Sequence, residues 1–215
     1  MIKVMVADFL YDSVNSNKSR TVPINIGYIV EYAKKIHGNK FDFTLYRKVD
    51  DFINDFNSGA PSIVAFSQSC WNADLTRGVL QWIKSTNPET LAVVGGPQVG
   101  TTEESVETFY TKNPLVDFCV PAYGEYGFSE FLHRYLDVGG NMKLMKRESI
   151  KGVSFISNNK LVNSFVEQLI VKPNEIPSPY LTGLLDVFLQ DGYSPIVQGM
   201  RGCPYLCTFC FASKL

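Results

Sequence analysis

The chain has 215 residues, a formal net charge of −1 and 45% apolar residues, which suits one globular domain and part of a second. Its basic residues are scattered, which argues against a nucleic-acid partner, and no apolar run reaches the ~18 residues of a membrane span. The N-terminus lacks a signal-peptide layout, so we expect a cytoplasmic, reducing location.

Apolar strands and amphipathic helices alternate along the first 136 residues. Strands are predicted over residues 2–10, 41–46, 61–67, 90–94 and 116–120, and helices over 24–37, 49–56, 74–85, 103–110 and 127–136. The continuous apolar run of the third strand is typical of a sheet that is covered on both faces. Five such units predict a doubly wound α/β domain with a five-stranded parallel sheet.

Ligands of doubly wound sheets bind at the carboxyl ends of the strands, beside the point where the strand order reverses. This places the candidate site among the loops at residues 8–11, 67–71, 95–100 and 123–126. Several glycines stand in these loops and would let the backbone approach a ligand closely. The alternative is that tight strand-to-helix turns need glycine for conformational reasons alone.

Residues 139–193 are predicted to be a connector. Two β-rich runs, 152–156 and 161–165, flank an Asn-Asn pair and predict a hairpin. Three prolines then indicate an extended crossing segment, which is followed by a short helix over 181–189. We expect residues 194–199 to form a strand that leads to a cysteine-rich loop.

Three of the five cysteines, Cys203, Cys207 and Cys210, have the spacing C-x3-C-x2-C. Thiolates are soft ligands for iron–sulfur clusters or zinc, and a [4Fe-4S] cluster normally takes four of them. Three thiolates would leave one iron open to chelate a small molecule. The alternatives are a zinc site, which lacks a fourth Cys or His nearby, a disulfide with a spare thiol, and chance.

This segment resembles the cluster loop of radical S-adenosylmethionine (SAM) enzymes. The resemblance implies that Cys203, Cys207 and Cys210 hold a [4Fe-4S] cluster, that SAM binds the open iron, and that Phe209 lies near the adenine. Residues 194–215 would then begin the radical SAM domain. Because several β-α units of such a barrel are missing, the chain is interpreted as an N-terminal fragment that has no turnover by itself.

An α/β domain directly before this loop resembles the flavodoxin-like cobalamin-binding domain of B12-type radical SAM proteins. The resemblance covers residues 1–138, and its tentative cobalamin contacts are Ser67 after the third strand, Gly95 and Gly96 after the fourth, and Gly124 and Glu125 after the fifth. Cobalamin is therefore implied as a third cofactor, beside the cluster and SAM.

The sequence departs from mutase-type cobalamin domains, which carry a cobalt-binding histidine after the first strand. Here residues 8–13 contain none, and neither His37 nor His133 is placed to ligate cobalt. If cobalamin binds, we expect no histidine of this domain on its lower face. Of the remaining cysteines, Cys119 is predicted to be a core residue and Cys70 a free thiol.

For the whole protein the resemblance implies reductive cleavage of SAM to a 5′-deoxyadenosyl radical and methyl transfer from cobalamin to an unactivated carbon. The implied partners are a small-molecule or peptide substrate and an electron donor such as flavodoxin or ferredoxin. One alternative is a radical SAM protein whose α/β domain binds no cobalamin and recognises a carrier or peptide. The other is a non-enzymatic binding module with a zinc or vestigial cysteine loop.

Overall fold

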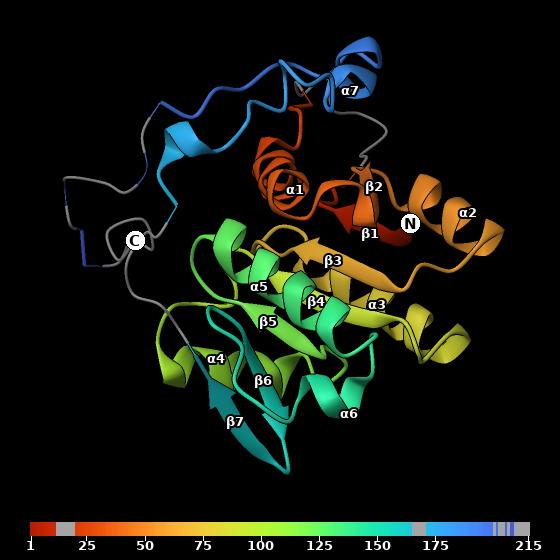
Figure 1. Ribbon diagram of the computed structural model, residues 1–215. Helices are drawn as coiled ribbons and strands as arrows, with labels where there is room; N and C mark the ends of the chain where they lie inside the picture. Colours follow the sequence, from red (N-terminus) through yellow and green to blue (C-terminus); the bar gives the residue numbers. More distant parts are fainter. Residues whose placement is uncertain (12–19, 165–170, 200, 202–204, 206, 209–215) are drawn as a thin grey trace.

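We analysed a computed structural model, which describes residues 1–11, 20–164, 171–199, 201, 205, 207 and 208. A central sheet lies between two layers of helices, and a long C-terminal segment crosses above them (Figure 1). The doubly wound α/β architecture that the alternating pattern predicts is therefore confirmed.

The sheet has the strand order β2-β1-β3-β4-β5-β6-β7. Its first five strands run parallel, as predicted. Their bounds are β1 Ile2–Ala7, β2 Phe41–Tyr46, β3 Ile63–Ser67, β4 Leu91–Gly95 and β5 Phe118–Val120. Strand β1 is shorter than the predicted 2–10, because the chain turns after Ala7 and buries the Phe9 ring against Phe52 and Phe66.

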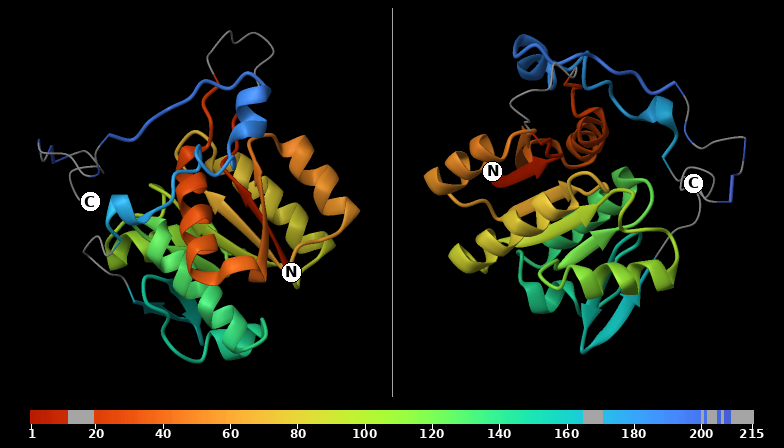
Figure 2. Two further views of the ribbon diagram at one scale, coloured as in Figure 1. Left: turned by 45° about the horizontal axis from the view of Figure 1, so that its top comes forward. Right: turned by 180° about the vertical axis from the view of Figure 1, so that it is seen from behind.

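Five helices cover the two faces of the parallel strands (Figure 2). Their bounds are α1 Ile24–His37, α2 Val49–Ser58, α3 Ala73–Thr86, α4 Glu103–Lys112 and α5 Gly124–Asp137. Helices α1 and α5 pack with one set of alternating strand residues, including Val4 and Val6. Helices α2, α3 and α4 pack with the opposite set, including Met5. This division follows from the period-2 alternation of side chains along a strand.

Helix α5 begins at Gly124, three residues before the predicted start at residue 127. Gly124 and Glu125 therefore lie in its first helical turn and not in a loop. A glycine pattern suggested a turn here, whereas the acidic Glu125 favours a helix N-terminus, where the helix dipole is positive. The short helix α6, Met142–Met145, was not predicted; its N-cap is Asn141, whose side chain accepts from the backbone N–H of Leu144.

The predicted hairpin forms, and it extends the sheet. Strands β6, Ser154–Ser157, and β7, Lys160–Asn163, pair antiparallel, and Ser154 of β6 pairs with Cys119 of β5. Asn158 and Asn159 have φ values of 51° and 59°, the positive pair that a two-residue type I′ turn requires. The limits of a separate connector, residues 139–193, stay a prediction.

The crossing segment, which we define as residues 171–199, contains a single turn of 3-10 helix, η2 (Pro173–Glu175), and helix α7 (Asp186–Gln190). Another such turn, η1 (Gly38–Lys40), follows α1. The expected strand over 194–199 does not form: Ser194 makes one bridge with Thr21, and residues 195–199 have no regular structure. A strand needs a partner along its length, and the described residues offer one only at Thr21.

No helix in the described part of the chain is both long and apolar enough to cross a membrane.

Candidate functional site

A cavity of about 550 Å³ opens at the carboxyl ends of β1, β3, β4 and β5. Its walls are the first half of α1, the first turn of α5, and residues 196–198 and 201 of the C-terminal part of the chain. The volume is in the range of small-molecule and cofactor sites, and the position is where doubly wound sheets bind their ligands. The site thus lies at the edge of the sheet that the sequence indicated.

The five tentative cobalamin contacts come together in this cavity. Ser67, Gly95, Gly96, Gly124 and Glu125 all line it, although they stand on three different strand-to-helix connections. Parallel strands bring their carboxyl ends to one edge, which explains how residues so far apart in sequence meet. Their role as cobalamin contacts stays a prediction.

Backbone conformation and packing account for Gly96. It has a φ of 98°, and a Cβ there would lie 2.7 Å from the carbonyl oxygen of Gln68. A larger residue would push β4 away from the β3 loop, so this glycine lets two walls of the cavity approach each other. A Cβ at Gly124 would lie 2.7 Å from Cδ1 of Ile29, the end of a side chain that can shift, so packing does not require glycine at that position.

A buried polar network lies beneath the cavity. Asn25 of α1 donates to the Ser67 hydroxyl over 2.8 Å, and Asn72 donates to the carbonyl oxygen of Ser67 and to the carboxylate of Asp8. Asp8 also pairs with Arg47 at 2.8 Å. Burial raises the pKa of Asp8, and the charge of Arg47 opposes that rise. The network fixes the ends of β1 and β3, and with them the orientation of Ser67.

The rim opposite Ser67 carries a buried ion pair. The Arg201 guanidinium donates to the Glu125 carboxylate over 2.5 Å, and both side chains are more than nine-tenths buried. The guanidinium carbon lies 5.1 Å from the ring centroid of Tyr123 and 5.9 Å from that of Tyr28, which is within cation–π range. The positive charge of Arg201, from the C-terminal part of the chain, is thus held between α1 and α5.

Exposed apolar side chains surround the mouth of the cavity. Trp71, in the loop that follows β3, is 60% exposed, and Val197 of the crossing segment is 82% exposed. Ile196 lines the cavity beside Val197. Apolar side chains exposed together around a concave site are typical of a surface that a ligand covers.

The cysteine motif lies almost wholly outside the described residues. Cys203, Cys210 and Phe209 belong to the part that the structure does not describe, and Cys207 is half-buried. Over the described positions, no group of three His, Cys, Asp or Glu side chains could hold a metal ion. The cluster ligands and the SAM contact at Phe209 therefore stay predictions.

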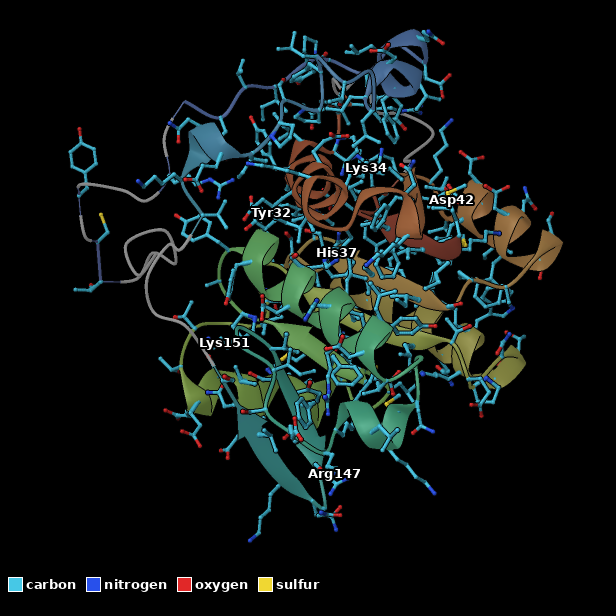
Figure 3. The ribbon with its side chains drawn as sticks, viewed as in Figure 1. Tyr32, Lys34, His37, Asp42, Arg147 and Lys151 are labelled. Carbon is cyan, nitrogen blue, oxygen red and sulfur yellow. The ribbon has the colours of Figure 1, made fainter. Side chains whose placement is uncertain are left out.

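Neither histidine lines the cavity, in agreement with the sequence analysis. His37 is buried where α1 meets α5, and its Nε2 lies 3.0 Å from the Ser129 hydroxyl (Figure 3). His133 is exposed beside Asp137. Both histidines thus lie outside the set of residues that line the cavity, and their absence from a cobalamin site stays a prediction.

The two isolated cysteines are where the sequence predicted them. Cys119 is fully buried in β5, and burial raises the pKa of its thiol to about 12. Such a thiol stays protonated and is a core residue. Cys70 is exposed and forms no disulfide.

Sequence reasoning missed several residues of the cavity. Trp71 and Tyr123 stand in two loops that the topology indicated, but only the glycines and polar residues of those loops were chosen. A large aromatic residue in the loop after a buried strand would have been a usable signal. No sequence signal pairs Arg201 with Glu125, because 76 residues separate them.

No protein-family model matches the chain. It is 29% identical over 157 residues to 2-(S-pantetheinyl)-carbapenam-3-carboxylate methyltransferase of Streptantibioticus cattleyicolor, a match that covers 70% of this chain and 22% of that protein. It is 28% identical over 156 residues to the cobalamin-dependent radical SAM methyltransferase TokK of Streptomyces tokunonensis, with the same coverage. The uncharacterized methyltransferase PH0819 of Pyrococcus horikoshii is 28% identical over 199 residues, covering 89% of this chain and 40% of that one.

Two solved structures of the cobalamin-dependent SAM radical enzyme OxsB share the fold. The form with bound aqua-cobalamin superposes with a TM-score of 0.70 at 19% identity, over 97% of this chain and 28% of that one. The selenomethionine-labelled apo form gives 0.69, over 98% and 28%. The chain thus spans about a fifth of the length of the first two curated relatives and less than a third of OxsB.

Proposed function

We propose that this chain, which is related in sequence to cobalamin-dependent radical SAM proteins, is the corrinoid-binding part of a radical SAM methyltransferase. The observation that carries the proposal is the cavity at the carboxyl edge of the sheet, where Ser67, Gly95, Gly96, Gly124 and Glu125 meet. The names of the curated relatives and the fold of OxsB support it.

The residues of the cavity fit part of a corrinoid. Apolar side chains from strands and helices form most of the wall, and Ser67, Glu125 and Arg201 supply polar groups at separate points. A cobalamin is larger than this cavity, so we expect the nucleotide tail to enter and the corrin ring to cover the mouth beside Trp71. Neither His37 nor His133 lines the cavity, so we expect that a bound cobalamin would receive no histidine from this chain.

The chemistry of the bound groups would be radical initiation at the cluster with SAM and methyl transfer at cobalamin. The chain's own contribution is orientation and the exclusion of water. Asn25 and Asn72 hold the β3 end, and the apolar mouth keeps solvent from a bound ring. We propose Cys203, Cys207 and Cys210 as cluster ligands and Phe209 as a SAM contact, with a small-molecule or peptide substrate and a flavodoxin or ferredoxin donor for the whole protein.

An anaerobic titration with hydroxocobalamin, followed by its visible spectrum and by calorimetry, tests the proposal. We expect saturable binding of one corrinoid per chain. Ser67→Ala should weaken it by about threefold to tenfold, because one hydrogen bond of roughly 1 kcal/mol is lost. Ser58→Ala is the matched control, since this exposed serine bonds only within α2. No saturable binding to the wild-type chain would contradict the proposal.

A second test addresses the cysteines. After anaerobic reconstitution, Cys203→Ala should lower bound iron and sulfide while the far-ultraviolet circular dichroism of the α/β domain stays unchanged. One zinc per chain and no iron would favour the non-enzymatic module. That these 215 residues have no turnover by themselves stays a prediction, which SAM cleavage by the reconstituted chain would overturn.

The second candidate function is that of a radical SAM protein whose α/β domain binds no cobalamin and recognises a carrier or peptide. Hydroxocobalamin binding separates the two functions, since a recognition module would leave the corrinoid spectrum unchanged.

A further inference from the structure

The guanidinium of Arg201 is only partly satisfied by the protein. Its Nη2 donates to Glu125 and its Nε to the side-chain oxygen of Gln198, 3.3 Å away. Within the part of the chain that the structure describes, Nη1 is buried and has no hydrogen-bond partner. Leaving a charged donor desolvated and unpaired costs roughly 1–3 kcal/mol or more, so native structures rarely do it without a reason.

The surroundings of Arg201 hold the guanidinium in one orientation. Its side chain is 7% exposed, Glu125 anchors one nitrogen, and the rings of Tyr28 and Tyr123 lie within cation–π distance. Arg201 also lines the 550 Å³ cavity. A rigid, planar donor at a cavity wall is suited to bind an acceptor oxygen, because little side-chain entropy remains to be lost.

A purely structural role for the Arg201–Glu125 pair explains the unpaired nitrogen of Arg201 less well than a ligand-binding role does. A buried ion pair is weak evidence for stability, because desolvation of the two charges offsets their attraction. A structural pair would also be expected to use all the donors of the guanidinium. Here Glu125 and Gln198 satisfy two of the three nitrogens, and the third, Nη1, is buried without a partner among the described residues, in a side chain that lines a ligand-sized cavity.

We propose that Arg201 is a ligand-binding residue of the cavity: Glu125 positions it, and its Nη1 donates to an oxygen of the bound corrinoid. The acceptor is either an amide carbonyl on the corrin ring or the phosphate of the nucleotide tail. This inference rests on the proposed function, and it assigns the residue to a contact that the sequence did not indicate.

Arg201 lies close in sequence to the first cysteine of the C-x3-C-x2-C motif. Arg201 stands two residues before Cys203, and two residues of extended chain span about 7 Å at most. We therefore expect corrinoid binding at Arg201 and the placement of the nearby cysteine segment to influence each other.

The test compares two corrinoids on the full chain, hydroxocobalamin and dicyanocobinamide, which lacks the nucleotide tail. Arg201→Gln should weaken hydroxocobalamin binding by roughly 10- to 100-fold, the range for a hydrogen bond to a charged group. Arg201→Lys keeps the charge but not the planar fork, so we expect an intermediate loss. Arg77→Gln is the matched control, because Arg77 pairs with Asp74 on α3 and does not line this cavity.

The two corrinoids identify the acceptor. If Arg201→Gln weakens both ligands equally, the contact is a ring amide; if it weakens only hydroxocobalamin, the contact is the phosphate. A double variant with Glu125→Gln should bind no more weakly than Arg201→Gln alone if Glu125 acts through Arg201. Unchanged binding of both corrinoids by a folded Arg201→Gln chain would overturn the inference and leave the proposed function intact. No binding by the wild-type chain would overturn both.

Discussion

The sheet and the crossing segment are held in place in different ways. Each parallel strand is hydrogen-bonded to a neighbour and packed on both faces, as β3 is between β1 and β4. The crossing segment has no strand partner of any length. It is attached by the bridge from Ser194 to Thr21, and within the segment the hydroxyl of Tyr180 bonds both backbone groups of Ile196.

The sheet and the crossing segment both contribute residues to the wall of the cavity. The floor and most of the wall come from the sheet and its helices, whereas residues 196–198 close one side. A small apolar cluster, Val22, Leu185, Phe188 and Tyr193, supports the segment near α7. The sheet therefore provides the stability, and the segment provides a wall with few contacts of its own that a ligand can help to hold.

The largest expected effect is in the sheet. Phe118→Ala removes a fully buried ring that contacts Phe131 and Phe155, and it should lower the free energy of unfolding by about 3–5 kcal/mol. Leu181→Ala in the crossing segment is the control, because that side chain is 91% exposed and should change stability little. Urea unfolding measures both. Equal losses would mean that the two regions do not differ as described.

The next effect concerns ligand binding at the mouth of the cavity. Trp71→Ala should weaken hydroxocobalamin binding by roughly tenfold, because an aromatic surface that the corrinoid would cover is lost. Stability should hardly change, since Trp71 is mostly exposed. Tyr11→Ala is the control: it is also an exposed aromatic residue at this edge, but it does not line the cavity. Calorimetric titration of the wild-type, Trp71→Ala and Tyr11→Ala chains with hydroxocobalamin measures the loss of affinity.

A smaller effect should follow from loosening the crossing segment. Tyr180→Phe removes the hydroxyl that bonds Ile196, at a cost of about 1 kcal/mol that falls on the segment and not on the sheet. Amide hydrogen exchange at residues 194–198 should become faster while exchange in β3 and β4 stays unchanged. Tyr205→Phe, at an exposed tyrosine, should alter neither. Faster exchange throughout the sheet would show that the two regions unfold together.

The smallest expected effect is a change of stability with pH, which tests the region of the sheet and its helices. Burial lowers the pKa of His37 below its usual 6.5, and the nearby charges of His133 and Lys40 act in the same direction, while a hydrogen bond to Ser129 opposes them. The unfolded chain then takes up the proton first, so stability is present above about pH 6.5 and is lost as the pH falls below it.

Urea unfolding at about pH 7.5 and pH 5.5 measures this loss, because the two values lie on either side of the unfolded pKa. His37→Gln should reduce the difference between the two conditions, whereas His133→Gln, at the exposed histidine, should leave most of it. An unchanged difference in His37→Gln would assign the acid sensitivity to other groups.

The sequence by itself determined most of the α/β domain. Its helix and strand periods predict the five β-α units, and α1 and β2 have the predicted bounds, because those signals are local. The Asn158-Asn159 pair likewise predicts the hairpin, since two positive φ angles are a property of the turn itself. The C-x3-C-x2-C spacing suggested a resemblance to radical SAM enzymes, and the chain is 28% identical over 156 residues to the cobalamin-dependent radical SAM methyltransferase TokK.

Only the tertiary structure decided what lies around the cavity. The hairpin could have been a free connector, but β6 pairs with β5 and lengthens the sheet. Residues 194–199 have strand-like composition, yet they form no strand, because pairing depends on a partner that composition does not supply. The pair between Arg201 and Glu125 joins residues far apart in sequence, and such a contact exists only once the sheet has brought α1, α5 and the crossing segment to one edge.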